Sequence, residues 1–184
     1  MAEVIVFHHA RGATVPVGDF ADALRAAGHT VYAPDLYDGR TFDTIDAGMA
    51  YADELGGPIA IVDRARTAVA SLPSEAVYVG FSLGALPAQA LAQTRRGARG
   101  AVLCYSAVPL GEWSDNWPAT WPDGVRLQLH ILAGDEDFEI AQRLAATVPD
   151  AELSVYPGSE HYLAEHDERA AALLTERVLD FLAA

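Results

Sequence analysis

One short segment, Gly80-Phe81-Ser82-Leu83-Gly84, constrains the fold more than any other part of the chain. It directly follows the apolar run 76–79 and opens a stretch, 83–94, that favours a helix. A strand that turns sharply into a helix needs residues without bulk on both sides of the turn, because side chains there would collide. Gly80 and Gly84 meet this need. The pattern therefore predicts a strand–turn–helix unit with the Ser82 hydroxyl exposed at its tip, as is typical of a serine nucleophile.

Short apolar runs alternate with helical patterns along the whole sequence. Expected strands cover residues 4–7, 30–33, 76–79, 100–105, 125–133 and 153–156, and expected helices cover 16–27, 45–55, 58–71, 83–94, 138–148 and 169–182. Continuous apolar strands separated by helices are typical of a parallel sheet covered on both faces. We therefore predict one α/β domain over residues 1–184, with three layers and a mostly parallel sheet of about six strands. Ligands bind such a sheet outside the carboxyl ends of its strands.

Charge and cysteine content exclude several kinds of partner and bond. The formal net charge is −14, and all 12 basic residues are Arg. Such a surface repels phosphate backbones and anionic lipids, so we expect no nucleic-acid partner and no membrane partner. Cys104 is the only cysteine, so no intrachain disulfide can form, and its apolar surroundings favour a packing role. No signal peptide or long apolar segment is visible, so we expect a cytoplasmic protein.

A serine hydroxyl needs a base to take its proton and a third group to orient that base. In chains with this kind of turn, the acid and then the histidine follow the serine. Three histidines follow Ser82. His130 lies inside an apolar strand and is expected to be a core residue. His161 follows the last strand through a turn-rich loop, so we prefer it as the base, with His166 as the alternative.

The acid is expected in the loop after strand 125–133, which reads Gly134-Asp135-Glu136-Asp137-Phe138. Each of its three carboxylates could reach a histidine ring. We prefer Asp137, with Asp135 as the alternative. An aspartate at this place could equally cap the helix expected over 138–148. Both roles can coexist in one loop.

Backbone amides are expected to stabilise an oxyanion beside Ser82. The Leu83 N–H lies at the start of the helix, and Ala10 lies in the loop after the first strand. Adjacent His8 and His9 point in opposite directions in an extended chain, and no third ligand lies nearby in the sequence, so we expect no metal and no other cofactor. The residues expected to border a substrate are His9, Arg11, Tyr37 and Tyr105, together with Trp113, Trp117 and Trp121, for which core packing is the alternative.

Taken together, these segments resemble the dienelactone hydrolase family of α/β hydrolases. The similarity lies in residues 8–12, residues 28–37, the turn around Ser82, residues 134–138 and His161, and thus spans nearly the whole chain. It implies an α/β-hydrolase fold and the hydrolysis of a small carboxylic ester or lactone through an acyl-enzyme. The family spacing Gly-x-x-Asp favours Asp137 as the acid, and the family places an oxyanion donor at the position of Ala10.

Two positions depart from the family pattern. The best-known members use a cysteine where this chain has Ser82, and they carry a glutamate where this chain has His9. A hydroxyl needs a stronger general base than a thiol, so the cysteine-specific activation is not implied. We expect a minimal sheet that begins with strand 4–7 and has no lid. Two alternative functions are a thioesterase or acyltransferase that uses the same residues, and a non-catalytic binding protein with this fold.

Overall fold

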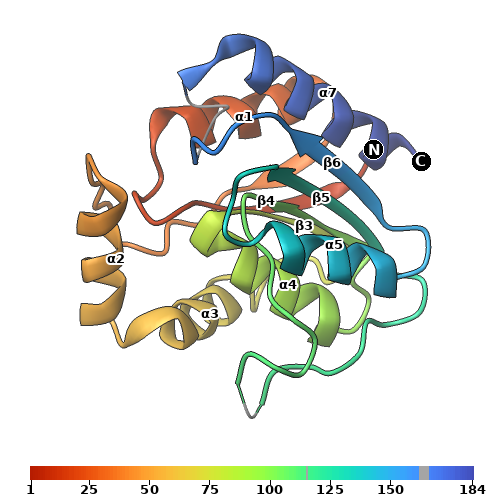
Figure 1. The fold of residues 1–184 in the computed structure, drawn as a ribbon, viewed down its shortest axis with the longest axis horizontal. Helices are drawn as coiled ribbons and strands as arrows, with labels where there is room; N and C mark the ends of the chain where they lie inside the picture. The colour runs from red at the N-terminus through yellow and green to blue at the C-terminus, as the bar shows by residue number, and fades with distance from the viewer. Residues whose placement is uncertain (115, 162–165) are drawn as a thin grey trace.

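The computed structural model describes residues 1–114, 116–161 and 166–184. A six-stranded sheet with the order β2-β1-β3-β4-β5-β6 forms its centre, and every neighbouring pair of strands is parallel (Figure 1). The strands are β1 (Glu3–Phe7), β2 (Thr30–Tyr32), β3 (Ala76–Phe81), β4 (Gly100–Cys104), β5 (Arg126–Leu132) and β6 (Glu152–Tyr156). This arrangement confirms the predicted fold class.

Helices cover both faces of the sheet (Figure 1). They are α1 (Val15–Ala26), α2 (Ile45–Glu54), α3 (Gly57–Ala68), α4 (Ala85–Thr94), α5 (Phe138–Thr147) and α7 (Glu168–Ala183). One face lies under α1 and α7, and the other lies under α3, α4 and α5, with α2 beside α3. Every strand and helix expected from the sequence is present, with ends that differ by at most three residues. None of the helices in the described residues is both long and apolar enough to cross a membrane.

The strands are apolar throughout because each face of the sheet has its own core. Val4 and Val6 of β1 pack on the side of α1 and α7, whereas Ile5 and Phe7 pack on the side of α3, α4 and α5. Successive side chains of a strand point to opposite faces, so a sheet that is buried on both faces needs apolar residues at every position. This burial explains the continuous apolar runs in the sequence.

The order in which successive strands join the sheet reverses at β1. From β1 it moves outward to β2, and it then returns to form β3 on the other side of β1. The loops that follow β1 and β3 therefore leave the same edge of the sheet next to each other. Open α/β sheets bind their ligands at such a switch point, where neighbouring loops diverge.

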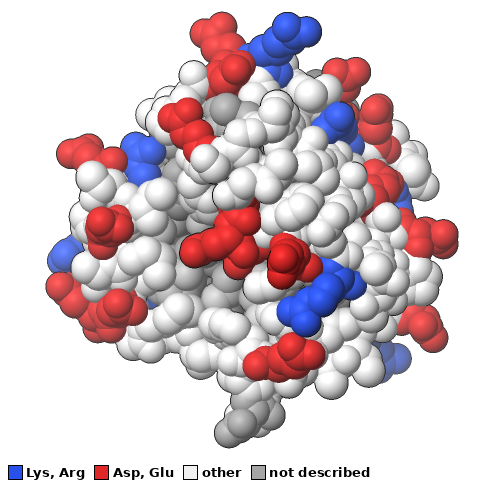
Figure 2. Space-filling model, viewed as in Figure 1, with Lys and Arg blue, Asp and Glu red and all other residues white. Residues whose placement is uncertain are grey.

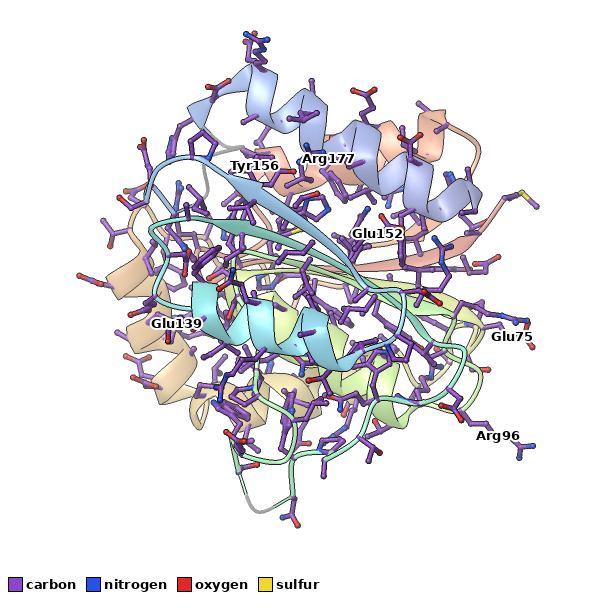
Figure 3. The ribbon with its side chains drawn as sticks, turned by 45° about the vertical axis from the view of Figure 1, so that its right-hand side comes forward. Glu75, Arg96, Glu139, Glu152, Tyr156 and Arg177 are labelled. Carbon is purple, nitrogen blue, oxygen red and sulfur yellow. The ribbon has the colours of Figure 1, made fainter. Side chains whose placement is uncertain are left out.

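A polar network connects β5, β6 and α7 on the α1 and α7 side of the sheet, and it is buried at His130 and Gln128. Three of its other residues, Glu152, Tyr156 and Arg177, are labelled in Figure 3. His130 is 1% exposed, and its Nδ1 and Nε2 atoms lie 2.8 Å from the Tyr156 hydroxyl and 3.0 Å from Gln128 Oε1. The Gln128 amide in turn donates to Glu152 at 2.8 Å. His130 is thus a satisfied core residue, as the sequence predicted.

This network makes the stability of the fold sensitive to acid. Burial, reinforced by the charge of Arg177, lowers the pKa of His130 from 6.5 to about 3. The unfolded chain therefore binds more protons than the folded chain below pH 6.5, and the free energy of unfolding must fall as the pH falls. We expect a loss on the order of 3 kcal/mol between pH 7 and pH 4 from this residue, measured by urea unfolding. His130→Gln should flatten the pH dependence, and equal slopes for both proteins would contradict this account.

Candidate active site

The chain changes direction sharply where β3 ends. Residues Ser82–Gly84 form a single 3₁₀ turn between β3 and α4. Ser82 has a φ of +49°, a left-handed conformation that is strained for a residue with a side chain. A methyl group on Gly80 would collide with the Gly84 carbonyl, and one on Gly84 would collide with the carbonyls of Phe7 and His8. Both glycines are therefore required by close backbone packing, as predicted.

Ser82 lies at one end of a hydrogen-bonded chain of three side chains. Its Oγ is 2.8 Å from His161 Nε2, and His161 Nδ1 is 3.0 Å from Asp135 Oδ2. An ionised carboxylate can only accept hydrogen bonds, so Nδ1 of His161 donates to Asp135. In the neutral ring Nε2 is then the acceptor and faces the Ser82 hydroxyl. This geometry equips His161 to take a proton from Ser82.

The acid at His161 differs from the preferred prediction. The structure places Asp135 against the ring, so the expected contact between Asp137 and His161 is wrong. The Asp135 Oδ1 atom accepts a hydrogen bond from the Asp137 N–H at 3.0 Å, and this tight turn directs Oδ2 of Asp135 toward His161. The Asp137 carboxylate instead accepts a hydrogen bond from Ser106 Oγ at 2.6 Å. Two residues of one loop thus point their carboxylates at different partners.

Hydrogen bonds hold Asp135 in its ionised form. Its side chain is only 4% exposed, and burial by itself would raise its pKa. The hydrogen bonds from His161 and from the Asp137 N–H, together with the charge of His161, outweigh this effect, and the pKa of Asp135 is lowered. An ionised Asp135 keeps the His161 proton on Nδ1 and can stabilise a positive charge on the ring.

These groups open into a cavity of about 590 Å³ at the carboxyl edge of the sheet. Its described lining consists of Ile45, Met49, Pro58, Ser82, Leu83, Leu86, Tyr105, Ser106, Trp113, Gly134, Asp135, Glu136, Asp137, Ser159 and His161. On the side of the molecule shown in Figure 2, acidic side chains lie over the region of α5. Ser106 also lines the cavity and was not among the residues expected there, although it directly follows Tyr105 at the end of β4.

Some residues expected to border the substrate lie in this cavity and others do not. Tyr105 and Trp113 line it, and the Tyr105 ring centroid is 5.9 Å from that of His161. Tyr37 is fully buried and donates to the Gly48 carbonyl, so its expected place at the pocket is wrong. Trp117 packs on Trp113, and the Trp121 ring donates to a backbone carbonyl, in agreement with the packing alternative.

Two expected substrate-bordering residues, His9 and Arg11, belong to the loop after β1. Both lie outside the described lining of the Ser82 cavity. Arg11 donates through Nε to the Phe42 carbonyl at 3.1 Å. His9 is 1% exposed; its Nδ1 accepts the Arg11 N–H, and its Nε2 lies 3.2 Å from the Thr14 hydroxyl. The structure thus gives both side chains internal partners within the loop and its surroundings, which corrects the expectation that they border the pocket.

The two predicted oxyanion donors, Leu83 and Ala10, belong to the loops that follow β3 and β1. Leu83 lines the cavity, and Ala10 lies in a tight turn closed by the hydrogen bond from Gly12 N–H to the His9 carbonyl. Close packing of Gly84 on the His8 carbonyl holds this loop against the turn after β3. Their role therefore stays a prediction.

Among the described residues, no group of three or more His, Cys, Asp and Glu side chains is arranged to hold a metal ion. His8 is buried, and burial lowers its pKa. Its Nε2 accepts the Leu36 N–H, so its Nδ1 carries the proton and donates to the His9 carbonyl at 2.8 Å. Both ring nitrogens of His8 are therefore engaged in the loop.

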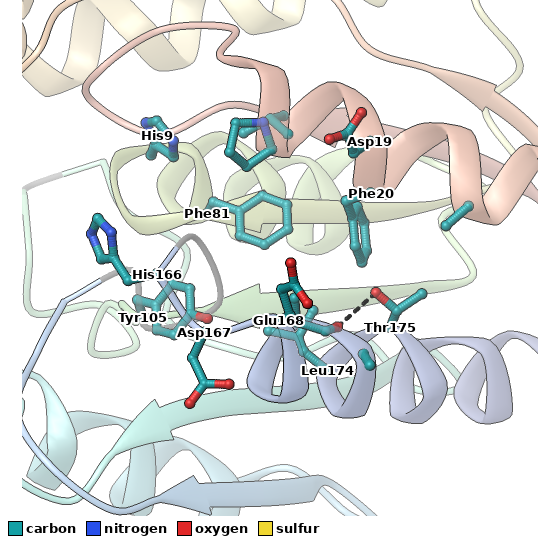
Figure 4. Close-up of a pocket in the computed structure, with 15 residues that line it drawn as sticks. His9, Asp19, Phe20, Phe81, Tyr105, His166, Asp167, Glu168, Leu174 and Thr175 are labelled. Carbon is teal, nitrogen blue, oxygen red and sulfur yellow. Dashed lines mark hydrogen bonds between the residues drawn. The ribbon is translucent and has the colours of Figure 1, made fainter.

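A second cavity, of about 500 Å³, lies between α1 and α7 on the other side of Tyr105 (Figure 4). Phe20, Phe81 and Leu174 supply much of its apolar lining, and Tyr105 is the one described residue that it shares with the Ser82 cavity. The alternative base, His166, is exposed and lines this second cavity. Tyr105 thus separates the site around Ser82 from an apolar space behind it.

An open parallel sheet with a serine turn after β3 and a histidine after β6 defines the class of α/β hydrolases. The sequence matches the model of the dienelactone hydrolase family over residues 1–184, and the chain belongs to this family. A search of curated proteins found no matching relative. The resemblance drawn from the sequence is therefore confirmed at the level of the family.

Solved structures show the same fold at low sequence identity. A proposed dienelactone hydrolase from Klebsiella pneumoniae subsp. pneumoniae MGH 78578 is 20% identical with a TM-score of 0.74, over 100% of this chain and 87% of its own. The dienelactone hydrolase from Anabaena variabilis ATCC 29413 is 16% identical with a TM-score of 0.67, over 96% and 84%. P91, a dienelactone hydrolase-like promiscuous phosphotriesterase from metagenomic libraries, is 18% identical with a TM-score of 0.66, over 89% and 73%.

Proposed function

We propose that this protein is a serine hydrolase that cleaves a small carboxylic ester or lactone through an acyl-enzyme. The observation that carries the proposal is the hydrogen-bonded chain from Ser82 through His161 to Asp135, with links of 2.8 and 3.0 Å. It lies at the carboxyl edge of the sheet and faces a cavity of suitable size for a small ligand. Membership in a family of hydrolases agrees with this chemistry.

In the proposed reaction, Ser82 Oγ attacks the carbonyl carbon while His161 Nε2 takes its proton. The backbone amides of Leu83 and Ala10 stabilise the oxyanion that forms. His161 then gives the proton to the leaving oxygen, and an ester bond links Ser82 to the acyl group. Water attacks this ester as His161 takes a proton from it, and the return of that proton to Ser82 Oγ releases the acid. Asp135 keeps the ring of His161 oriented through both steps.

A covalent probe tests this assignment. A fluorophosphonate should react with Ser82, and mass spectrometry of the digested protein should find the adduct on the peptide that contains this residue. Ser82→Ala should abolish labelling, whereas Ser71→Ala, which removes an exposed serine outside the cavity, should leave it unchanged. An adduct on Cys104, or no adduct on a folded protein, would argue for a non-catalytic binding protein or a different nucleophile.

Other reactions can use the same groups. P91 is described as a promiscuous phosphotriesterase, so phosphotriesters belong in the substrate panel beside esters and lactones. Thioesters and alternative acyl acceptors test whether the acyl group passes to a molecule other than water. Turnover of esters well above that of phosphotriesters and thioesters is expected under the proposal.

The cavity should favour short acyl and alcohol groups. Tyr105, which is 3% exposed, separates the Ser82 cavity from the apolar space between α1 and α7. Short aryl esters and small lactones should therefore show a higher kcat/KM than esters of about twelve carbons or more. Each methylene that enters an apolar site contributes up to about 0.8 kcal/mol, so a steady rise of kcat/KM through long chains would show that the two cavities form a tunnel.

The charge of the cavity should also select among small esters. Its described lining contains the carboxylates of Asp135, Glu136 and Asp137 and no Arg. An ester that carries a carboxylate should therefore have a kcat/KM roughly tenfold below that of its neutral isostere at low salt, and high salt should reduce the difference. Glu136→Gln should narrow the gap, whereas Glu75→Gln at the opposite edge of the sheet should not. Equal rates for both esters would contradict this prediction.

A further inference from the structure

Ser106 occupies an unusual place at the end of β4. The preceding residue, Tyr105, has a φ of +63°, and its N–H donates to the His130 carbonyl at 2.8 Å. A left-handed conformation at a tyrosine is strained and persists only where the surrounding structure holds it. The chain turns at this residue, and Ser106 lines the Ser82 cavity. Strained residues therefore end the two neighbouring strands β3 and β4, at Ser82 and at Tyr105.

The Ser106 hydroxyl contacts the acid loop of the site. It donates to Asp137 Oδ2 at 2.6 Å, a short hydrogen bond to a carboxylate. The N–H of Asp137 donates to Asp135 Oδ1 at 3.0 Å, and the N–H of Phe138 donates to the Asp135 carbonyl at 3.2 Å. Ser106 is thus connected to Asp135 through a single residue, and Asp135 contacts His161.

The hydrogen bond from Ser106 keeps the Asp137 carboxylate from competing with Asp135 for His161. Two carboxylates, two residues apart, line the same cavity as one histidine ring. The Nδ1–H of His161 forms one good hydrogen bond at a time, so a free carboxylate at residue 137 would compete with Asp135 for the ring. The Ser106 hydroxyl gives the Asp137 carboxylate a different donor. The same bond anchors the backbone of residue 137, whose N–H orients Asp135.

We propose that Ser106 and Asp137 are positioning residues that select Asp135 as the partner of His161, through the hydrogen bonds from Ser106 Oγ to Asp137 and from the Asp137 N–H to Asp135. This inference rests on the proposed function, because it concerns the alignment of the base for Ser82. Neither side chain takes part in bond formation. Their contribution is the orientation of the carboxylate behind the base, which enters the rate of the chemical step.

Substitution of Ser106 provides the first test. Ser106→Ala should lower kcat for a short aryl ester about tenfold and change KM less than twofold, because the substrate still binds while His161 is misaligned. Ser106→Thr retains a hydroxyl and should keep most of the activity. Ser71→Ala serves as the control for a serine outside the cavity. Melting temperatures of all variants establish that the proteins are folded.

Substitution of Asp137 provides the second test. Asp137→Asn keeps an acceptor oxygen for Ser106 and should lower kcat only slightly. Asp137→Ala loses the bond to Ser106 but also removes the competing carboxylate, so it should lower kcat less than Ser106→Ala does. The double variant Ser106→Ala/Asp137→Ala should be no worse than either single variant, since both remove the same bond. The low-field proton signal of the His161 Nδ1–H in NMR spectra should shift in Ser106→Ala and stay in place in Ser106→Thr.

Three results would overturn the inference. The first is an unchanged kcat together with an unchanged His161 proton signal in folded Ser106→Ala. The second is a double variant whose loss of kcat equals the product of the losses in the two single alanine variants. The third is a loss of kcat in Ser106→Thr equal to that in Ser106→Ala. If Ser106→Ala fails to fold, Asp137→Ala tests the same bond from its other side. Full activity of Ser82→Ala would instead refute the proposed function itself, so the two failures are distinguishable.

Discussion

Ser82→Ala is expected to lower kcat/KM for short esters by about 10⁴-fold or more, because the proposed reaction has no other nucleophile. The melting temperature should change little, since the small hydroxyl contributes mainly its bond to His161 at 2.8 Å. Steady-state kinetics with a short aryl ester and thermal unfolding measure both quantities. The two readouts together separate loss of chemistry from loss of fold.

A second variant at the same position provides a matched control. Ser82 has a φ of +49°, and alanine suffers the same backbone strain there, whereas glycine does not. Ser82→Gly should therefore be as inactive as Ser82→Ala but melt at a higher temperature. Substantial residual activity in both variants would exclude Ser82 as the nucleophile. An equal melting temperature for both would contradict the proposed strain.

Asp135→Asn is expected to lower kcat by about 10³- to 10⁴-fold, whereas Asp137→Asn should lower it less than tenfold. Asparagine at residue 135 presents a neutral amide to His161, and its N–H can donate to Nδ1. The ring proton then lies on Nε2, so Nε2 can no longer accept a proton from Ser82. The Asp137 carboxylate lies on Ser106, and asparagine can keep that contact. Kinetics of the two isosteric variants, with melting temperatures as the control for folding, provide the comparison.

Which of the two variants loses more kcat decides which carboxylate acts as the acid behind His161. A large loss in Asp137→Asn with a small loss in Asp135→Asn would return the role of the acid to Asp137, the residue that the family spacing favours. It would also remove the basis for a positioning role of Ser106. Comparable large losses in both variants would mean that the loop acts as one unit and that neither carboxylate can be assigned alone.

Local sequence was sufficient to predict the strands and helices of this protein. Runs such as that of β3 are apolar at every position because both faces of the sheet are buried. The two glycines around Ser82 could also be predicted from the sequence, since each lies two residues from the serine at a sharp turn from strand to helix. The place of His161 after the last strand followed from the rule that parallel strands deliver their loops to one edge.

The choice between Asp135 and Asp137 depended on tertiary structure. Both residues lie in one loop at the correct edge of the sheet, and their side chains are chemically identical. What distinguishes them is a hydrogen bond from Ser106, a residue 31 positions earlier in the sequence. No local pattern carries this information, because the contact exists only when β4 and β5 lie side by side in register.

The same reason explains the misplaced pocket residues. Tyr37 follows a strand at the correct edge, yet its ring packs against His8 and Tyr51 in the core. The sequence by itself determined the strands, the serine turn and the edge at which the site forms, because these follow from chain geometry over a few residues. Which side chains face the cavity, which carboxylate meets His161 and how Tyr105 divides the space were decided only by the packing of distant segments.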